Sequence, residues 1–440
     1  MDKESILAAV SESKIRFIRL WFTDVLGMLK SFSIMAEELP EALESGMGFD
    51  GSSIEGFARI EESDMIAMPD PSTFTLLPWT DEGQPPVARM FCDILMPNGE
   101  NYVGDPRWVL KRNVAEAAKL GYKMYTGPEL EYFYFKNSQG VEVLDRGGYF
   151  DLTPLDVSMS LRHDTALALE SMGIKVEYSH HEVAPSQHEI DLRYTEALAM
   201  ADNAMTYRLV VKEVALQNGV YATFMPKPIF GENGSGMHVH QSLFKGSKNA
   251  FYEAKDKYQL SAVGKSYIAG LLKHSREICL VLAQWVNSYK RLVPGYEAPV
   301  YIGWARRNRS ALVRVPMYKP GKEKATRAEL RCPDPACNPY LAFSVMLAAG
   351  LKGVKEGYKL PEPIEEDIYE MTAARKAELG IEALPGSLGE AIELTEKSEL
   401  VRETLGDHVF EKFIANKKHE WDDFRIHVSQ YELENYLPIL

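Results

Sequence analysis

The chain has 440 residues, of which 45% are hydrophobic and 25% charged, a composition typical of folded domains and not of disordered or fibrous proteins. This length exceeds the usual size of one hydrophobic core, so two domains are expected. The formal net charge of -14 argues against a general attraction to nucleic acid or to an anionic membrane.

Cysteine content and the length of apolar runs indicate the cellular compartment of the protein. The 4 cysteines are too few for a disulfide framework in a chain of this length, which fits a reducing cytoplasm. Acidic residues precede a very short apolar run at the N-terminus, and the sequence contains no stretch of about 18 apolar residues. The sequence therefore predicts a cytoplasmic protein with no membrane segment and no nucleic-acid partner.

Two domains are predicted from the order of the elements. Residues 14–103 consist of short apolar runs separated by Gly, Pro and Asp, which predicts a small strand-rich domain. Asp105 then occupies an N-cap position, with Pro106 at the first helical position and Gly121 as the stop signal. A boundary near residue 104 follows, and a second domain is expected over 104–440.

The second domain repeats one arrangement of elements. A helix closed by glycine leads directly into a strand at Gly121, Gly173 and Gly219. This predicts helices packed on a sheet, in a larger α+β domain whose strand order the spacing leaves open. Residues 355–405, rich in Glu, Pro and Lys, predict an exposed helical excursion.

Two nucleotide-binding motifs are matched only by letter. Residues 46–51 (GMGFDG) follow the dinucleotide fingerprint, but that fingerprint follows a strand and opens a helix, whereas a helix precedes this segment. A mobile loop is the preferred interpretation there. Residues 264–266 (GKS) resemble the end of a P-loop, yet Gln259 occupies the position of its first glycine. Both motifs are rejected.

Polar pairs within aromatic or apolar strands give the strongest chemical signal. Residues at i and i+2 point to the same face of a strand, and charged groups there must be paired or bound to metal to offset desolvation. One pair alone is more often a solvated face, but together they predict a site. Carboxylates with one or two imidazoles suit Mg²⁺ or Mn²⁺ better than zinc, and five glutamates are enough for two ions. The pairs are Glu129 with Glu131, His238 with His240 and Glu329 with Arg331, and a fourth segment adds Glu182 and Glu189.

A basic segment lies between Lys290 and Arg331, with eleven lysines or arginines against three acidic residues. Arginine recognises phosphate and carboxylate through paired hydrogen bonds. Divalent cations and arginines without a P-loop predict phosphoryl transfer by another architecture. The arginines are Arg291, Arg306, Arg307, Arg309, Arg314, Arg327 and Arg331.

Seven blocks of sequence, in order, resemble signature blocks of the type I glutamine synthetases. They are FDGSSIEGF, GPELEYF, HHEV, NGSGMHVHQS, NSYKRLVPGYEAP, RRNRS and ELRCPDP. The likeness extends over about residues 14–440. It implies a β-grasp N-terminal domain over 14–103, a catalytic domain over 104–440 with helices on an antiparallel sheet, and a homododecamer of two hexameric rings.

The resemblance also implies the reaction and its residues. ATP would join ammonia to the γ-carboxylate of glutamate through γ-glutamyl phosphate, giving glutamine, ADP and phosphate. Two Mg²⁺ or Mn²⁺ ions per subunit would be held by Glu131, Glu182 and Glu189, and by Glu129, His238 and Glu329. Glu177, His240 and Ser242 would surround ATP, with Arg309 and Arg314 facing the transferring phosphate. Glutamate would contact Glu131, Asn233, Gly234, His238, Arg291, Glu297 and Arg331.

The ammonium pocket implied by the resemblance contains Asp50, Tyr149, Glu182 and Glu297. Asp50, on a loop that reaches the active site of the adjacent subunit, would take a proton from ammonium. The loop that contains Glu297 would close over the intermediate. A γ-glutamyl ligase for a larger amine is the nearest alternative. A catalytically dead family member with a binding role is another, although its ligand positions are intact here.

The resemblance is to the shorter subclass of the family and implies the regulation of that subclass. The insertion of the longer subclass is absent, and Tyr358 lies near that subclass's adenylylated tyrosine in a poor surrounding motif, so adenylylation is not expected. The shorter subclass is inhibited by glutamine through an arginine that corresponds to Arg59. The resemblance leaves room for a regulatory protein partner.

Overall fold

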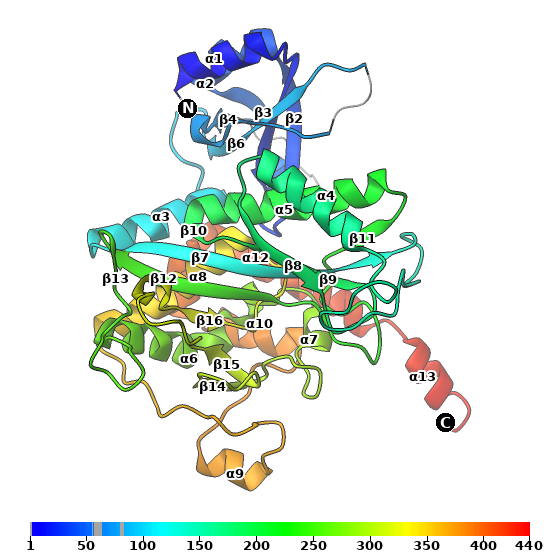
Figure 1. Ribbon diagram of the computed structural model, residues 1–440, viewed down its shortest axis with the longest axis vertical. Helices are drawn as coiled ribbons and strands as arrows, with labels where there is room; N and C mark the ends of the chain where they lie inside the picture. The colour runs from blue at the N-terminus through cyan, green and yellow to red at the C-terminus, as the bar shows by residue number, and fades with distance from the viewer. Residues whose placement is uncertain (1, 55, 57–63, 80–82) are drawn as a thin grey trace.

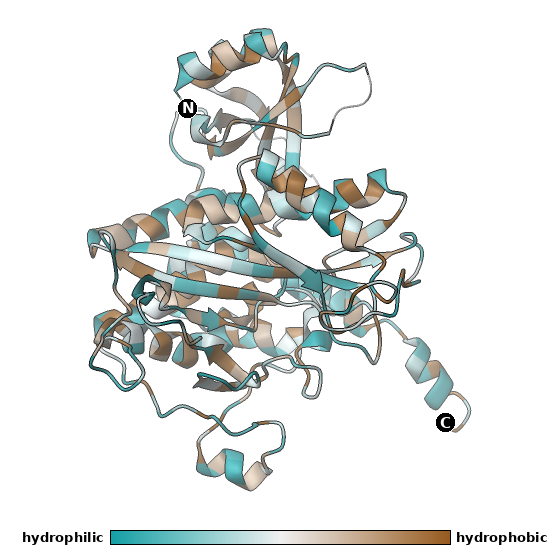
Figure 2. Cartoon of the chain, viewed as in Figure 1, coloured by the Kyte–Doolittle hydropathy of each residue, from teal (hydrophilic) through white to brown (hydrophobic). Residues whose placement is uncertain are grey.

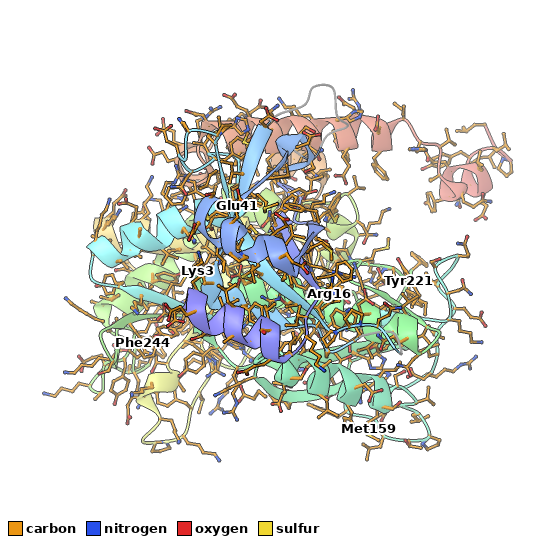
Figure 3. The ribbon with its side chains drawn as sticks, turned by 90° about the horizontal axis from the view of Figure 1, so that it is seen from above. Lys3, Arg16, Glu41, Met159, Tyr221 and Phe244 are labelled. Carbon is orange, nitrogen blue, oxygen red and sulfur yellow. The ribbon has the colours of Figure 1, made fainter. Side chains whose placement is uncertain are left out.

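The computed structural model describes residues 2–54, 56, 64–79 and 83–440. A small N-terminal domain stands above a larger domain in Figure 1. Figure 3, seen from above, shows Lys3, Arg16 and Glu41 on the small domain and Met159, Tyr221 and Phe244 on the large one. The two-domain arrangement matches the predicted division of the chain into a strand-rich part and an α+β part.

The small domain is a sheet of order β2-β1-β6-β4-β3, with β5 paired to β6. β1 and β6 run parallel at its centre, and the other pairs are antiparallel. Its elements are α1 (Lys3–Glu12), β1 (Phe17–Thr23), β2 (Leu29–Met35), η1 (Ala36–Glu38), α2 (Leu39–Ser45), β3 (Met47–Asp50), η2 (Gly51–Ile54), β4 (Asp64–Pro69), η3 (Pro71–Thr73), β5 (Thr75–Leu76) and β6 (Val87–Leu95).

Residues 47–50 form strand β3, where a loop was expected from the sequence. Gly46 ends α2 with φ of 72°, a conformation that costs glycine little because it has no Cβ. The next four residues form β3, which pairs antiparallel with β4 from Met47 opposite Ala67 to Asp50 opposite Asp64. The preceding helix was predicted correctly. The order of elements here is helix then strand, whereas a dinucleotide fingerprint follows a strand and opens a helix.

The β1 strand has two buried faces, which explains its nearly continuous apolar sequence. Ile18 and Leu20 pack in the small domain's own core, whereas Trp21 belongs to the core of the large domain. Successive side chains of a strand point to opposite faces, so the sheet is packed on both sides. The two domains therefore share an apolar interface.

The large domain is built on a second sheet of order β14-β15-β16-β12-β7-β9-β8. Its pairs are antiparallel except for the parallel pair β14 and β15. β10 and β11 also pair with β7, and β13 pairs with β12. The strands are β7 (Lys123–Phe135), β8 (Val176–His181), β9 (Gln187–Leu192), β10 (Thr195–Glu196), β11 (Tyr221–Thr223), β12 (Met237–Lys245), β13 (Lys248–Asn249), β14 (Tyr301–Ala305), β15 (Ala311–Arg314) and β16 (Ala328–Leu330).

Helices cover one side of this sheet and extend the core. α3 begins as predicted, with the Asp105 side chain accepting a hydrogen bond from the backbone N–H of Arg107. Gly121, Gly173 and Gly219 all have positive φ just after a helix, as the glycine pattern predicts. The helices are α3 (Pro106–Lys119), α4 (Met159–Ser171), α5 (Ala197–Gln217), α6 (Ala262–Leu282), α7 (Ser288–Arg291) and α8 (Pro339–Glu356), with η4 (Glu323–Ala325) before β16.

The predicted excursion over 355–405 is correct only for its first part. α9 (Ala373–Glu378) stands away from the body at the bottom of Figure 1. In contrast, α10 (Leu388–Glu396) and α11 (Glu399–Leu405) bury Leu388, Ile392 and Val401 in the main core. These two helices therefore pack on the core through their apolar faces, although the composition of residues 355–405 is polar.

The C-terminal segment leaves the body of the domain. α12 (Asp407–Arg425) packs with its N-terminal half, and α13 (Gln430–Asn435) extends outward in Figures 1 and 3. Figure 2 shows both hydrophilic and hydrophobic residues there, and Leu437 and Ile439 are each 76% exposed. Within the described residues, no helix combines the length and apolar character that a membrane crossing needs.

Candidate active site

One face of the second sheet collects the polar pairs found in the sequence. His238 lies opposite Glu129, His240 opposite Glu329, and Glu131 opposite Glu189 in the strand register. Residues directly opposite in antiparallel strands share a face, as do residues two apart in one strand. Because helices cover the other side, the structure places these side chains together on the face that the helices leave open.

The first group of possible ligands is Glu129, His238 and Glu329, whose donor atoms all lie within 4.8 Å of one another. Oε2 of Glu129 lies 3.4 Å from Nδ1 of His238, and Oε1 of Glu129 lies 2.6 Å from Nε2 of His240. Burial alone would raise the pKa of Glu129, but the two imidazoles hold it well below its usual range. The three residues were predicted as one metal site, and the structure brings them together.

The second group is His180, Glu182 and Glu189, also within 4.8 Å. Glu131, the predicted third ligand beside Glu182 and Glu189, lies in the same cavity but accepts hydrogen bonds from Gly236 N and Gln187 Nε2, both at 2.9 Å. His180 was missed by the sequence reasoning. Its place two residues before Glu182, within the HHEV block, was the available signal.

The electrostatics of this face favour a bound cation. Burial and the charge of Glu182 raise the pKa of Glu131 well above its usual value. Burial and the neighbouring carboxylates, with Asp191 first among them, do the same to Glu189. Clustered carboxylates repel one another unless a positive charge lies among them. Oxygen donors with an imidazole in each group fit divalent ions of the Mg²⁺ or Mn²⁺ class.

A cavity of about 280 Å³ lies over both groups. Its carboxylates face four arginines: Arg291, Arg309, Arg314 and Arg331. Arg314 Nε lies 2.5 Å from Glu329 Oε2, and Arg331 Nε lies 3.2 Å from Oε1 of the same carboxylate. These contacts fix the side chain of Glu329 between two cations, so the cavity carries both anion-binding and cation-binding groups.

The remaining wall of this cavity contains the other predicted substrate residues. Tyr149, Asn233, Gly234 and Glu297 all line it. A Cβ at Gly234 would lie 2.4 Å from the carbonyl oxygen of Pro226, so only glycine fits there. Tyr149 lies under Arg309, with the guanidinium carbon 5.5 Å from the ring centre.

A second cavity of about 220 Å³ adjoins the first, and Glu129 and Tyr178 line both. It contains the three residues predicted around ATP, namely Glu177, His240 and Ser242. Arg327 also lines it and donates from Nε to Nδ1 of His240 at 3.0 Å. Burial raises the pKa of Asp191, which lines this cavity, to about 6, and the charge of Glu129 adds to the effect. Of the five residues predicted to bind ATP, these three lie in the second cavity, whereas Arg309 and Arg314 line the first cavity with the substrate residues.

Some predicted residues are not brought to these cavities. Asp50 lies on β3 of the small domain and lines neither cavity. Arg306 and Arg307 line neither one, and their backbone N–H groups donate to the carboxylate of Glu365. Arg59 lies outside the residues that the structure describes.

Comparison with known proteins agrees with this geometry. Residues 14–97 match the glutamine synthetase β-grasp domain, and residues 103–436 match the glutamine synthetase catalytic domain. The chain belongs to the glutamine synthetase family. A glutamine synthetase of Mycolicibacterium smegmatis is 55% identical over 100% of this chain and 99% of its own length. The β-grasp and catalytic folds predicted from the sequence are therefore confirmed.

Solved structures extend the likeness to three dimensions. A structure titled "GmaS/ADP complex-Conformation 1" has a TM-score of 0.89 at 29% identity and covers 98% of this chain and 99% of its own. A Plasmodium falciparum glutamine synthetase has a TM-score of 0.87 at 25% identity, with 99% of each chain covered. Family membership makes this chain an ATP-dependent enzyme of glutamine synthesis that uses a divalent metal.

Proposed function

We propose that this chain joins ammonia to the γ-carboxylate of L-glutamate through γ-glutamyl phosphate, with ATP as the phosphoryl donor. The observation that carries the proposal is the pair of adjoining cavities that share Glu129 and Tyr178. One contains clustered carboxylates and arginines, including Arg309 and Arg314, and the other contains Glu177, His240 and Ser242. This arrangement suits transfer of a terminal phosphate from one cavity to an acceptor in the other.

The metal groups have separate roles in the proposal. Two Mg²⁺ ions, or Mn²⁺ in their place, fit the carboxylate-rich sets, with Glu129, His238 and Glu329 nearer the nucleotide and Glu131, Glu182 and Glu189 nearer glutamate. When bound, the ions neutralise developing phosphate charge and polarise the acceptor carboxylate.

Binding of glutamate and phosphate is assigned to residues that already face the cavity. Arg291 and Arg331 are buried beside the Asn233 and Gly234 segment, where guanidinium groups can hold the substrate's carboxylate. Arg309 and Arg314 are assigned to stabilise the phosphoryl group during its transfer. Glu177, His240 and Ser242 hold the nucleotide, and the likeness to a structure titled as an ADP complex supports this assignment.

The ammonia step uses residues from two chains. Tyr149, Glu182 and Glu297 line the cavity, and Asp50 of an adjacent subunit completes the ammonium pocket and accepts its proton. A site shared in this way needs an oligomer, and we assign the chain to a cytoplasmic homododecamer of two hexameric rings. We assign residues 14–103 to the domain that supplies Asp50 and residues 104–440 to the domain that supplies the metal ligands.

Feedback control by glutamine is assigned to Arg59, as in the shorter subclass. The Arg59→Ala variant should retain synthesis while losing glutamine inhibition, and an unchanged inhibition curve would exclude this role.

The proposed reaction is tested by phosphate release with glutamate, ATP and either ammonium or a panel of alkylamines. The proposal expects release that requires glutamate and is fastest with ammonium, because Asp50 and Glu297 favour a small cation. Faster turnover with a larger amine would instead support the alternative γ-glutamyl ligase.

A further inference from the structure

Two loops contribute to the lining of the first cavity. The loop between β11 and β12 contributes Asn233 and Gly234, which the proposed function assigns to glutamate. The loop between α7 and β14 contributes Tyr296 and Glu297, on the ammonia side. Lys227, in the first loop, joins the two, and the proposed mechanism gives it no role.

The backbone of Lys227 is fixed at the base of its loop. Its N–H donates to Oδ1 of Asn287 at 2.7 Å, and Nδ2 of Asn287 donates to its carbonyl at 3.0 Å. Asn287 immediately precedes α7, the short helix that ends at Arg291. The backbone N–H of Ser235 donates to the carbonyl of Pro226 at 2.8 Å and closes the loop. Lys227 therefore starts from a rigid position.

The side chain of Lys227 crosses to the other loop. Its ammonium lies 3.7 Å from the centre of the Tyr296 ring and donates to the carbonyl oxygen of Glu232. The residue is only 9% exposed, and burial lowers the pKa of its ammonium. Among the ion pairs of the described residues none includes Lys227. Attraction between a cation and an aromatic face strengthens as water is removed, so Tyr296 is a principal partner of this charge.

Tyr296 stands next to a residue with an unusual backbone. Glu297 has φ of 56°, and Gly295 has φ of 94°. Positive φ in a residue other than glycine persists only where the surroundings impose it. The Tyr369 hydroxyl donates to the carbonyl of Ala298. Lys227 therefore contacts the residue before Glu297, and Tyr369 contacts the residue after it.

We infer that Lys227 is a positioning residue that holds Tyr296, and with it the Glu297 turn, over the cavity. Lys227 couples the glutamate-binding loop to the ammonia-side loop. Its backbone is fixed in the glutamate-binding loop, and its ammonium group contacts Tyr296 in the ammonia-side loop. The inference rests on the proposed function and adds to it a residue that controls closure.

Closure matters because water competes with ammonia for the intermediate. If water reaches γ-glutamyl phosphate, its oxygen attacks the γ-carbonyl carbon and the bond to the phosphate oxygen breaks. Glutamate and inorganic phosphate are released, and the water protons go to the products. The net result is ATP hydrolysis without glutamine. The ratio of phosphate released to glutamine formed therefore reports closure.

The test compares Lys227→Met with Lys227→Arg in the assembled enzyme. Methionine retains an unbranched stem without charge, whereas arginine retains a cation that stacks on an aromatic ring. We expect Lys227→Met to raise the ratio of phosphate to glutamine at least threefold and to raise KM for ammonium, with KM for ATP unchanged. Lys227→Arg should restore a ratio near that of the wild type.

Tyr296 provides a second route in case the lysine variant does not fold. Tyr296→Leu should raise the ratio as Lys227→Met does, Tyr296→Phe should not, and the double variant should be no worse than either single one. A wild-type ratio in both Lys227→Met and Tyr296→Leu, or additive effects in the double variant, would overturn the inference. Failure of the wild type to form glutamine would instead overturn the proposed function.

Discussion

Glu129 on β7 lies directly opposite His238 on β12, with Oε2 3.4 Å from Nδ1. Glu329 reaches the same place from β16, the next strand along. Three strands thus contribute one ligand each to a single point. A slip of one residue in any strand would turn its ligand to the helix-covered face, so the register of this sheet determines the site.

Glu329→Gln removes one carboxylate charge while keeping the side-chain shape. Glu329 is 1% exposed and lies between Arg314 and Arg331, so the change removes a negative charge that neutralises a bound cation and leaves these two arginines without that charge. We expect weaker Mn²⁺ binding and lower turnover, by more than the roughly 10–100-fold that loss of an outer ligand partner causes. Paramagnetic Mn²⁺ titration and turnover measure this. Glu196→Gln, in an exposed carboxylate, is the control, and Mn²⁺ binding equal to that control would refute the assignment.

Arg107 joins the two domains, and its removal should destabilise both. Its guanidinium contacts Asp70 and Asp93 of the small domain at 2.7 and 2.6 Å and Asp202 of α5 at 3.0 Å. Arg107→Met leaves three carboxylates without this partner, which costs about 3–5 kcal/mol for a buried network.

The urea midpoint of the domain transition measures the cost. Arg375→Met, in an exposed arginine that pairs with Glu366 and Glu378, should leave the midpoint nearly unchanged. Equal midpoints for the two variants would contradict a structural role for the Arg107 network.

Asp156 and Arg162 predict an acid dependence of stability. Burial would raise the pKa of Asp156, but paired hydrogen bonds from Arg162, at 2.6 and 3.2 Å, lower it below 3.8. A lowered folded-state pKa stabilises the protein above the unfolded value, and this stability is lost as pH falls through the folded value. Arg162 also contacts Nδ1 of His188, the residue before Glu189.

The Asp156→Asn variant should therefore be less stable than the wild type at pH 6. It should also lose less further stability below about pH 4, where the unfolded-state carboxylate takes up a proton that the native carboxylate, with its lowered pKa, does not yet bind. Chemical unfolding at a series of pH values measures both effects, with Asp164→Asn, in an exposed carboxylate on α4, the helix that carries Arg162, as control. Parallel stability curves for the wild type and Asp156→Asn would exclude the predicted linkage.

Local sequence patterns predicted much of this structure. The parts that depend on pairing between distant strands could not be predicted from them. Alternation placed Glu129 and Glu131 on one face from the sequence alone, because a strand repeats every two residues. The pairing of His238 with Glu129 joins residues more than a hundred positions apart, and no spacing rule gives that. The β3 error arose because its partner β4 begins only at Asp64, and local propensity does not give a pairing between strands separated along the chain.

A shared active site predicts complementation between inactive variants. Asp50→Ala removes the proposed proton acceptor and Glu329→Ala a proposed metal ligand, and each alone should abolish most turnover. Co-expressed subunits that form mixed rings should regain partial activity, because some sites then combine an intact Asp50 with an intact Glu329. Mixed rings verified by native mass spectrometry but wholly inactive would refute the assignment of Asp50 to an adjacent subunit.

Oxygen transfer tests the central claim most directly. Glutamate labelled with ¹⁸O in its γ-carboxylate is incubated with enzyme, ATP and ammonium, and the phosphate is analysed by mass spectrometry. If γ-glutamyl phosphate forms, one labelled oxygen passes to phosphate for each glutamine made, because the bond between the γ-carbon and the bridging oxygen breaks when ammonia attacks. Glutamine produced together with unlabelled phosphate would contradict the account.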